Sequence, residues 1–229
     1  MKMSLYPKLA WDGIRKNKRF YLPYILTCIG MIMMFYIIHY LAAMTILNDM
    51  PGGDTLTVVF GFGYWIVTLF ASIFLFYTNS FLMRRRQKEF GLYNILGMGK
   101  GNLSILLLWE SVILFVISMA GGLMGGILLA KMAELCLIMI LNGEVTYDLR
   151  IDPDAFVNTW IIFALIFAMI FVKGLMKIRK SSAVALLKSE NIGEKPPRAN
   201  YLLGIAGIVI LAGAYYIALS IESPLIALA

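Results

Sequence analysis

Residues 103–130 read LSILLLWESVILFVISMAGGLMGGILLA, an apolar run in which Glu110 is the one charged residue. A helix needs about 20 apolar residues to cross the roughly 30 Å hydrocarbon core of a bilayer, and this run is longer. A segment in lipid must also satisfy its own backbone hydrogen bonds, which an α-helix does. The run therefore predicts a membrane-spanning helix.

Four more apolar runs predict an all-α membrane protein, a polytopic helical bundle of about five transmembrane helices. The hydrophobic fraction is 61% and the charged fraction 14%, against about 45–50% and about 25% in soluble domains. A membrane β-barrel would instead show segments of about 10 residues with alternating polarity, and the sequence has none. The expected spans are Leu22–Ile46, Thr57–Met83, Leu103–Ala130, Ala155–Met176 and Tyr201–Ile221.

The spans and the polar segments between them suggest four parts along the chain. The third helix is expected to continue through Leu141, which would make Leu103–Leu141 about 58 Å long at 1.5 Å per residue. Tyr21, Tyr24, Tyr36 and Tyr40 are interpreted as interfacial anchors of the first span. The parts are a cytoplasmic amphipathic arm (1–20), a four-helix transmembrane core (21–180), a cytoplasmic linker (181–200), and a fifth transmembrane helix with a truncated outer end (201–229).

The basic residues are segregated, which predicts the orientation in the plasma membrane. Of the 20 Lys and Arg residues, all but Lys131 and Arg150 lie in the N-terminal arm, in the segment 84–100 or in the segment 173–198. Basic loops stay in the cytoplasm, so the N-terminus is expected there. Nucleic-acid binding would require the charge to lie on a base-reading surface. We therefore expect the lipid bilayer as a partner, and no nucleic acid.

Motifs of catalysis and of cofactor binding are absent from the sequence. It contains no HExxH, GxSxG or CxxC, and its one histidine and two cysteines do not suggest a metal site. The segment Gly97–Lys100 lacks the GxxxxGK[ST] spacing of a phosphate loop. The sequence thus predicts a protein that is not an enzyme, has no catalytic residue and no metal site, and binds no cofactor of its own.

Within the expected spans, one carboxylate and one group of glycines stand out. Glu110 could pair with a lysine, bond a neighbouring helix or carry protons, because an intramembrane carboxylate is costly. Its position near the cytoplasmic end favours snorkelling or a structural hydrogen bond. The glycines form two overlapping small-xxx-small pairs, which permit close helix packing. They are Gly121, Gly122, Gly125 and Gly126.

The segment after the second span, RRRQKEFGLYNILGMGKGN (84–102), combines charge with an amphipathic pattern. Its apolar residues recur at near-helical spacing, and glycines end the pattern. We predict a separate short amphipathic helix at the cytoplasmic surface. Its apolar residues are Phe90, Leu92, Tyr93, Ile95 and Leu96.

This segment, followed by WESVILFVISMAGGLMGGILLAK (109–131), resembles the FtsX-like permease family of ABC transporters. The matching residues occur in the family's order: Arg84–Arg86, Lys88, Glu89, Gly91, Leu96, Gly97, Glu110, Gly121 and Gly125. The tail KIRKSSAVALLKSE (177–190) is also similar, although Ala183 stands where a proline is common. The opening KLAWDGIRKNKRFYLPYILT (8–27) is similar to bacitracin-resistance-type (BceB-like) permeases, of which the chain would be the N-terminal portion.

The resemblance implies a permease subunit that couples ATP hydrolysis to export, removal or sensing of peptide antibiotics at the cell envelope. ATP and Mg²⁺ would be bound by a separate ABC ATPase homodimer. The coupling residues would be Arg86, Lys88, Glu89, Phe90, Gly91, Tyr93, Leu96 and Gly97.

Two alternatives remain open at this point. One is an FtsX-like regulatory protein that relays the state of the ATPase to a sensor histidine kinase or an envelope hydrolase. The other is an inactive truncated fragment. BceB-like permeases have ten spans and a large extracellular domain, neither of which this sequence contains.

Overall fold

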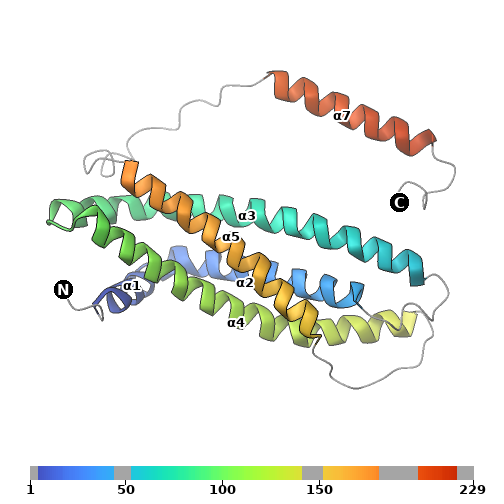
Figure 1. The fold of residues 1–229 in the computed structure, drawn as a ribbon, viewed down its shortest axis with the longest axis horizontal. Helices are drawn as coiled ribbons and strands as arrows, with labels where there is room; N and C mark the ends of the chain where they lie inside the picture. The colour runs from blue at the N-terminus through green and yellow to red at the C-terminus, as the bar shows by residue number, and fades with distance from the viewer. Residues whose placement is uncertain (1–4, 44–52, 141–151, 181–200, 221–229) are drawn as a thin grey trace. The chain divides into compact units, whose positions relative to one another are not determined.

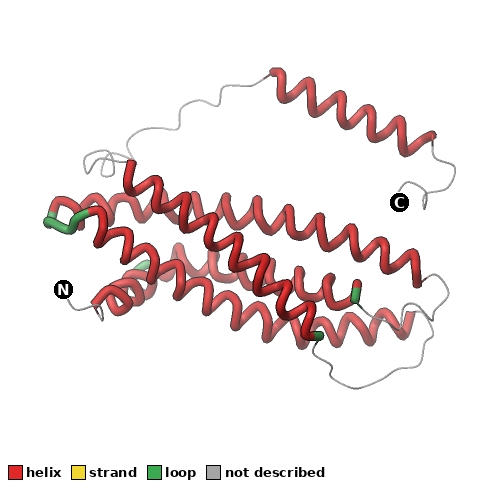
Figure 2. Tube along the Cα trace, in the orientation of Figure 1, coloured by secondary structure: helices red, strands yellow, loops and turns green. Residues whose placement is uncertain are grey.

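The computed structural model describes residues 5–43, 53–140, 152–180 and 201–220, and these residues form helices and no strands (Figure 2). The all-α prediction is therefore confirmed. The chain divides into two units, Met1–Asn191 and Ile192–Ala229. The helices of the first are α1 (Leu5–Lys16), α2 (Lys18–Ala42), α3 (Gly53–Ile95), α4 (Lys100–Ile140) and α5 (Pro153–Lys180), and the second contains α7 (Tyr201–Ser220).

Four helices, α2 to α5, are long and apolar enough to cross a membrane, and they overlap the first four predicted spans. The last three residues of the first predicted span, 44–46, lie outside the described residues. The predicted continuation of the third helix is present, since α4 runs to Ile140 without a break. The fifth predicted span coincides with α7, whose described apolar part, Gly204–Tyr216, is shorter than a span. Its crossing stays a prediction, and the predicted linker 181–200 lies outside the described residues.

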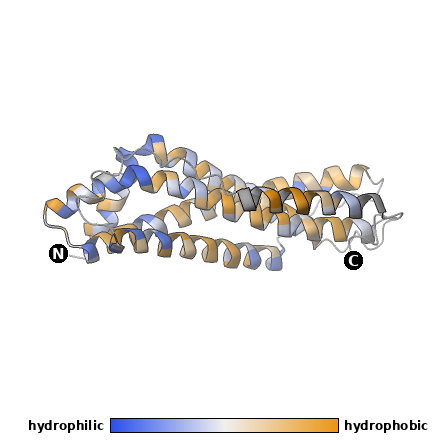
Figure 3. Ribbon diagram, turned by 90° about the horizontal axis from the view of Figure 1, so that it is seen from above, coloured by the Kyte–Doolittle hydropathy of each residue, from blue (hydrophilic) through white to orange (hydrophobic). Residues whose placement is uncertain are grey.

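In the first unit, α2 and α4 run in one direction and α3 and α5 in the other (Figure 1). α2 contacts all three of the other long helices. Its side chains Ile32, Phe35 and Tyr36 are fully buried in the main hydrophobic core. We call the end that holds α1 and the α3–α4 turn the basic end, and the opposite end the far end. Hydrophilic residues gather toward the basic end (Figure 3).

α3 carries a continuous exposed apolar stripe that ends shortly before its arginines. Large exposed side chains recur from Val58 to Phe81, over about 35 Å at 1.5 Å per residue, which is close to the thickness of a hydrocarbon core. Arg84 and Arg85 follow, and both are exposed. The stripe therefore marks where α3 can face lipid, and the helix continues beyond it to Ile95.

The segment after the second span is helical, but the prediction of a separate helix is wrong. Residues 84–95 are the last turns of α3 itself. Gly91 costs only about 1 kcal/mol inside a helix, too little to break one that is stabilised by packing. The break comes at Gly97, which has φ 91°. Met98 N–H donates to Tyr93 O (2.9 Å) and Gly97 N–H to Asn94 O (3.1 Å), the bonding pattern of a Schellman cap.

A second, smaller hydrophobic cluster lies at the basic end. α1 buries Tyr6, Ala10 and Ile14 and contacts the start of α4. The arm is thus a structural part of the unit as well as a carrier of positive charge. The buried members of the cluster come from four helices: Ala10, Met83, Phe90, Leu103, Leu106, Leu107 and Ile178.

Candidate functional site

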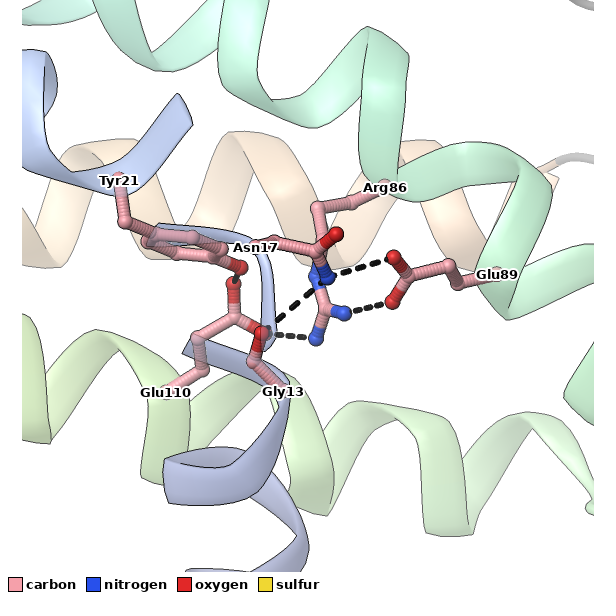
Figure 4. Close-up of polar contacts among 6 residues, drawn as sticks. All are labelled: Gly13, Asn17, Tyr21, Arg86, Glu89 and Glu110. Carbon is pink, nitrogen blue, oxygen red and sulfur yellow. Dashed lines mark hydrogen bonds and ion pairs between the residues drawn. The ribbon is translucent and has the colours of Figure 1, made fainter. Parts of the chain in front are cut away.

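At the basic end, buried polar side chains join the α1–α2 junction to α3 and α4 (Figure 4). Arg86 is 2% exposed and Glu110 is 3% exposed. Charged groups this deeply buried are stable only when they are paired and hydrogen-bonded. We call this set the charged network; its members are Asn17, Tyr21, Arg86, Glu89 and Glu110.

Glu110 is the centre of the charged network because both of its carboxylate oxygens are used. Arg86 Nη2 lies 2.6 Å from Glu110 Oε2. The hydroxyl of Tyr21 donates a hydrogen bond to Oε1. Three helices, α2, α3 and α4, therefore meet at one carboxylate, and the structural hydrogen bond expected for Glu110 is accompanied by an ion pair.

Glu89 connects the same arginine to the junction of α1 and α2. Its Oε2 pairs with Arg86 Nη1, and its Oε1 accepts a hydrogen bond of 2.7 Å from Asn17 Nδ2. Asn17 Nδ2 also lies 3.1 Å from the carbonyl oxygen of Gly13. Asn17, which lies between α1 and α2, is thereby bonded to the last turns of α3.

Aromatic rings cover the guanidinium of Arg86. Its Cζ lies 5.1 Å from the centroid of Phe90 and 5.8 Å from that of Tyr21. Rings at this distance stabilise a cation and exclude water from it. Removal of one partner from such a buried pair costs more than the pair contributes, because the other charge remains desolvated. The charged network therefore specifies how α2, α3 and α4 are placed relative to one another.

A second polar group ties α2 to α4 at the far end. Tyr40 OH donates to Glu134 Oε2 at 2.8 Å, and Lys131 Nζ lies 3.0 Å from the same oxygen. His39 Nε2 lies 3.1 Å from Asn158 Nδ2 and so connects α2 to α5. A tyrosine–glutamate pair thus joins α2 and α4 at each end of the unit.

We predict that Tyr40→Phe lowers the free energy of unfolding by about 1.5–3 kcal/mol, the range for a lost hydrogen bond to a charged group. The buried Glu134 would keep Lys131 but lose its bond to α2. Chemical denaturation in mixed micelles measures the loss. Tyr77→Phe is the control, because Tyr77 is 75% exposed; equal effects of the two substitutions would contradict the assignment.

Between the two tyrosine–glutamate pairs, the four predicted packing glycines lie against α2. A Cβ built on Gly122 would lie 2.5 Å from Ile32 Cγ2 and 3.3 Å from the carbonyl oxygen of Ile29. Cβ atoms on Gly121 and Gly125 would lie 2.9 Å from side-chain atoms of α2, and one on Gly126 would lie 3.2 Å away. Glycine is therefore needed for the close approach of the two helices.

The structure separates the predicted coupling residues into an inner and an outer group. Arg86, Phe90 and Gly91 are buried, Glu89 and Tyr93 are partly exposed, and the side chain of Lys88 lies outside the described residues. Phe90 belongs to the small core at the basic end and is fully buried there, so its part in coupling stays a prediction. Leu96 and Gly97 are exposed.

The exposed apolar residues at the end of α3 form what we call the hairpin surface: Leu92 (53% exposed), Ile95 (60%) and Leu96 (73%). A groove of about 310 Å³ lies beside it, between α1 and α3, and its lining includes Asp12, Lys16 and Tyr93. Apolar side chains this exposed, next to polar residues and beyond the lipid-facing stripe, are typical of a protein interaction site.

The sequence carried one unused signal for the pairing of Arg86 with Glu110. In an antiparallel helical hairpin, residues equally distant from the turn lie at the same level. Arg86 precedes Met98 by 12 residues, and Glu110 follows it by 12. The interpretation of Tyr21 and Tyr40 as interfacial anchors is wrong, because both are buried and bond glutamates.

The described residues contain no group of three or more His, Cys, Asp or Glu side chains that could hold a metal ion. The charged network pairs two carboxylates with a guanidinium, an amide and a tyrosine hydroxyl. Its chemistry is that of fixed charges that position helices.

Comparison with known proteins gives a family match. A model described as the FtsX-like permease C-terminal matches residues 61–183. That range is more than half of the 229-residue chain, and it includes the end of α3, the α3–α4 turn, α4 and α5. Arg86, Glu89 and Glu110 lie within it, whereas Asn17 and Tyr21 lie before it.

Curated relatives cover nearly the whole chain. The uncharacterized ABC transporter permease YvcS of Bacillus subtilis is 25% identical over 91% of the chain. The bacitracin export permease proteins BceB of Bacillus subtilis and of Halalkalibacterium halodurans are 25% and 26% identical over 92% and 91% of it. In each case the aligned part is 33% of the relative, so the chain spans about a third of the length of these proteins.

Proposed function

Because the chain belongs to the FtsX-like permease family of multi-pass cell-membrane proteins, we propose that it is a membrane part of an ABC transporter permease. In this proposal, ATP hydrolysis by a separate ATPase homodimer, which binds ATP and Mg²⁺, drives its movement. The process served is the export, removal or sensing of peptide antibiotics at the cell envelope. The names of the BceB relatives, which specify bacitracin export, support this substrate class.

The observation that carries the proposal is the position of the hairpin surface. It lies at the end of α3, beyond the exposed apolar stripe, on residues that precede the α3–α4 turn. A groove on an ATPase can receive such a helix end through its apolar side chains. Glu89 and Arg86, just before the hairpin surface, then connect the contact to Asn17 and Glu110.

The proposed orientation places the basic end, with the N-terminus, in the cytoplasm. Its arginines and lysines follow the positive-inside rule. An ATPase in the cytoplasm would then meet the hairpin surface directly, and the far end would face the outside. Movement imposed on the hairpin would reach α2 and α4 through the charged network.

We predict that the combined substitution Ile95→Glu and Leu96→Glu reduces co-purification of the cognate ATPase at least tenfold. Burial of a large apolar side chain contributes about 1.5–3 kcal/mol, and two charged side chains would remove this contribution. The measurement is the molar ratio of ATPase to chain after affinity purification from membranes. The control is Leu5→Glu on α1, where Leu5 is also exposed.

An unchanged ratio for the double variant would exclude the hairpin surface as the contact. Equal losses for the double variant and the control would show a general effect of added negative charge. Phe90 is unsuitable for this test, because its substitution would disturb the small core at the basic end.

A further inference from the structure

A groove of about 200 Å³ lies between α2 and α3, close to the level at which the apolar stripe of α3 ends. Its described walls are mostly aromatic and hydroxyl side chains with one arginine, and none of these described residues is acidic. The residues that matter here are Arg19, Phe20 and Thr27 from α2, and Tyr77, Thr78 and Phe81 from α3.

A second arginine is held at the same groove. The Cζ atom of Arg85 lies 5.3 Å from the centroid of Phe20 and 5.8 Å from that of Phe81. Both rings line the groove. Two guanidinium groups are therefore associated with one small cavity, and the stacked one is restrained by its aromatic contacts.

The groove has an apolar part and a basic part, which lie at different levels along α2 and α3. Tyr77 and Phe81 are exposed members of the lipid-facing stripe, whereas Arg19 lies in the first turn of α2 and Arg85 follows the stripe on α3. A ligand that fits must be apolar on one side and anionic on the other. Arginine binds phosphate with two parallel N–H donors, and a basic residue near a membrane surface attracts anionic lipid.

We propose that this groove binds an anionic membrane phospholipid, with its phosphate at Arg19 and Arg85 and the upper part of an acyl chain beside Tyr77 and Phe81. The groove beside α1 has Asp12 and Glu89 in its lining and lacks this preference for an anion. The apolar groove between α4 and α5, which includes Leu108 and Phe167, has no arginine or lysine in its lining.

The test uses the full chain in nanodiscs made of phosphatidylglycerol and phosphatidylcholine. Lipid that remains bound after mild detergent release is measured by native mass spectrometry. The wild-type chain should retain phosphatidylglycerol more than tenfold over its share of the bilayer. Arg19→Gln and Arg85→Gln should each reduce this enrichment about fivefold. Each basic residue near a membrane surface attracts anionic lipid with a free energy that corresponds to about this factor.

A control pair and a groove-filling variant distinguish binding in the groove from a general effect of basic charge on lipid retention. The control pair Arg15→Gln and Arg179→Gln removes two exposed arginines elsewhere in the unit and should leave the enrichment unchanged. Thr78→Phe fills the groove without a change of charge; the hydroxyl of Thr78 bonds only backbone carbonyls of its own helix among the interactions described. It should abolish retention while the melting temperature stays within a few degrees of the wild type.

Equal retention of the two lipids by the wild-type chain would overturn the proposal. So would a loss in the control pair as large as the loss in the groove variants. Displacement of the lipid by soluble glycerol phosphate would identify a phosphate site instead of a lipid site. None of these measurements requires the ATPase, so the outcome is independent of the proposed transport function.

Discussion

Glu110→Gln is expected to lower the free energy of unfolding by about 3 kcal/mol, the lower end of the range for breaking a buried ion pair. Within the described residues, the substitution leaves the buried guanidinium of Arg86 with the partly exposed Glu89 as its counter-charge. Denaturation in mixed micelles, followed by circular dichroism, measures the loss. Glu89→Gln is the comparison and should cost clearly less, because the Glu89 side chain is 34% exposed.

A double-mutant cycle decides whether the cost comes from the pair. If it does, Arg86→Gln combined with Glu110→Gln should cost 1–3 kcal/mol less than the sum of the single substitutions. Strict additivity would show that Arg86 and Glu110 act separately. Under the proposed function, the single substitutions should also weaken stimulation of the ATPase by its substrate, even in samples that still bind the ATPase.

Gly122→Leu should cost about 3 kcal/mol or more and separate α2 from α4. The new Cβ would lie 2.5 Å from Ile32 Cγ2 and 2.6 Å from Ile32 Cβ. A Cβ does not move when its side chain rotates, so a rotation cannot relieve the contact. Overpacking of a rigid core typically costs 1–3 kcal/mol, and here the tyrosine–glutamate pairs at both ends would also be stretched.

The matched control is Gly30→Leu on α2. Among the described residues, nothing beyond the neighbouring backbone of α2 itself lies within 4 Å of a Cβ built on Gly30, so this substitution should change stability by less than about 1 kcal/mol. The melting temperature and the micelle denaturation curve provide the comparison. Similar behaviour of the two variants would mean that α2 and α4 have room to separate, contrary to the close approach described.

The sequence was sufficient to predict where the long helices lie along the chain, but it was insufficient to predict which of their residues contact one another. Long apolar runs have one physical solution in lipid, so the four described spans follow from hydropathy. The end of α3 was harder, because Phe90 and Leu92 are equally apolar and only packing against Leu103 and Ile178 distinguishes the buried residue from the exposed one.

The sequence also does not show which of the three consecutive arginines is buried, as Arg86 illustrates. It follows Arg84 and Arg85 directly, and nothing in its chemistry separates it from them. The direction in which each side chain leaves α3 decides that Arg86 is buried while Arg84 and Arg85 are exposed. A register argument about the turn at Met98 could have paired it with Glu110, but Tyr21 comes from a helix whose register relative to α4 is not fixed by a short turn.

The tyrosine–glutamate pairs at the two ends of α2 and α4 have a mechanical consequence. Glu110 and Glu134 are about 36 Å apart along α4 at 1.5 Å per residue, and the glycines between them let side chains of α2 lie directly against the backbone of α4. Two helices that are bonded near both ends and in contact between those bonds move as one rigid body. A force on the basic end would then tilt α2 and α4 together and move their far ends, and α3 would follow at the basic end through the pair of Arg86 with Glu110.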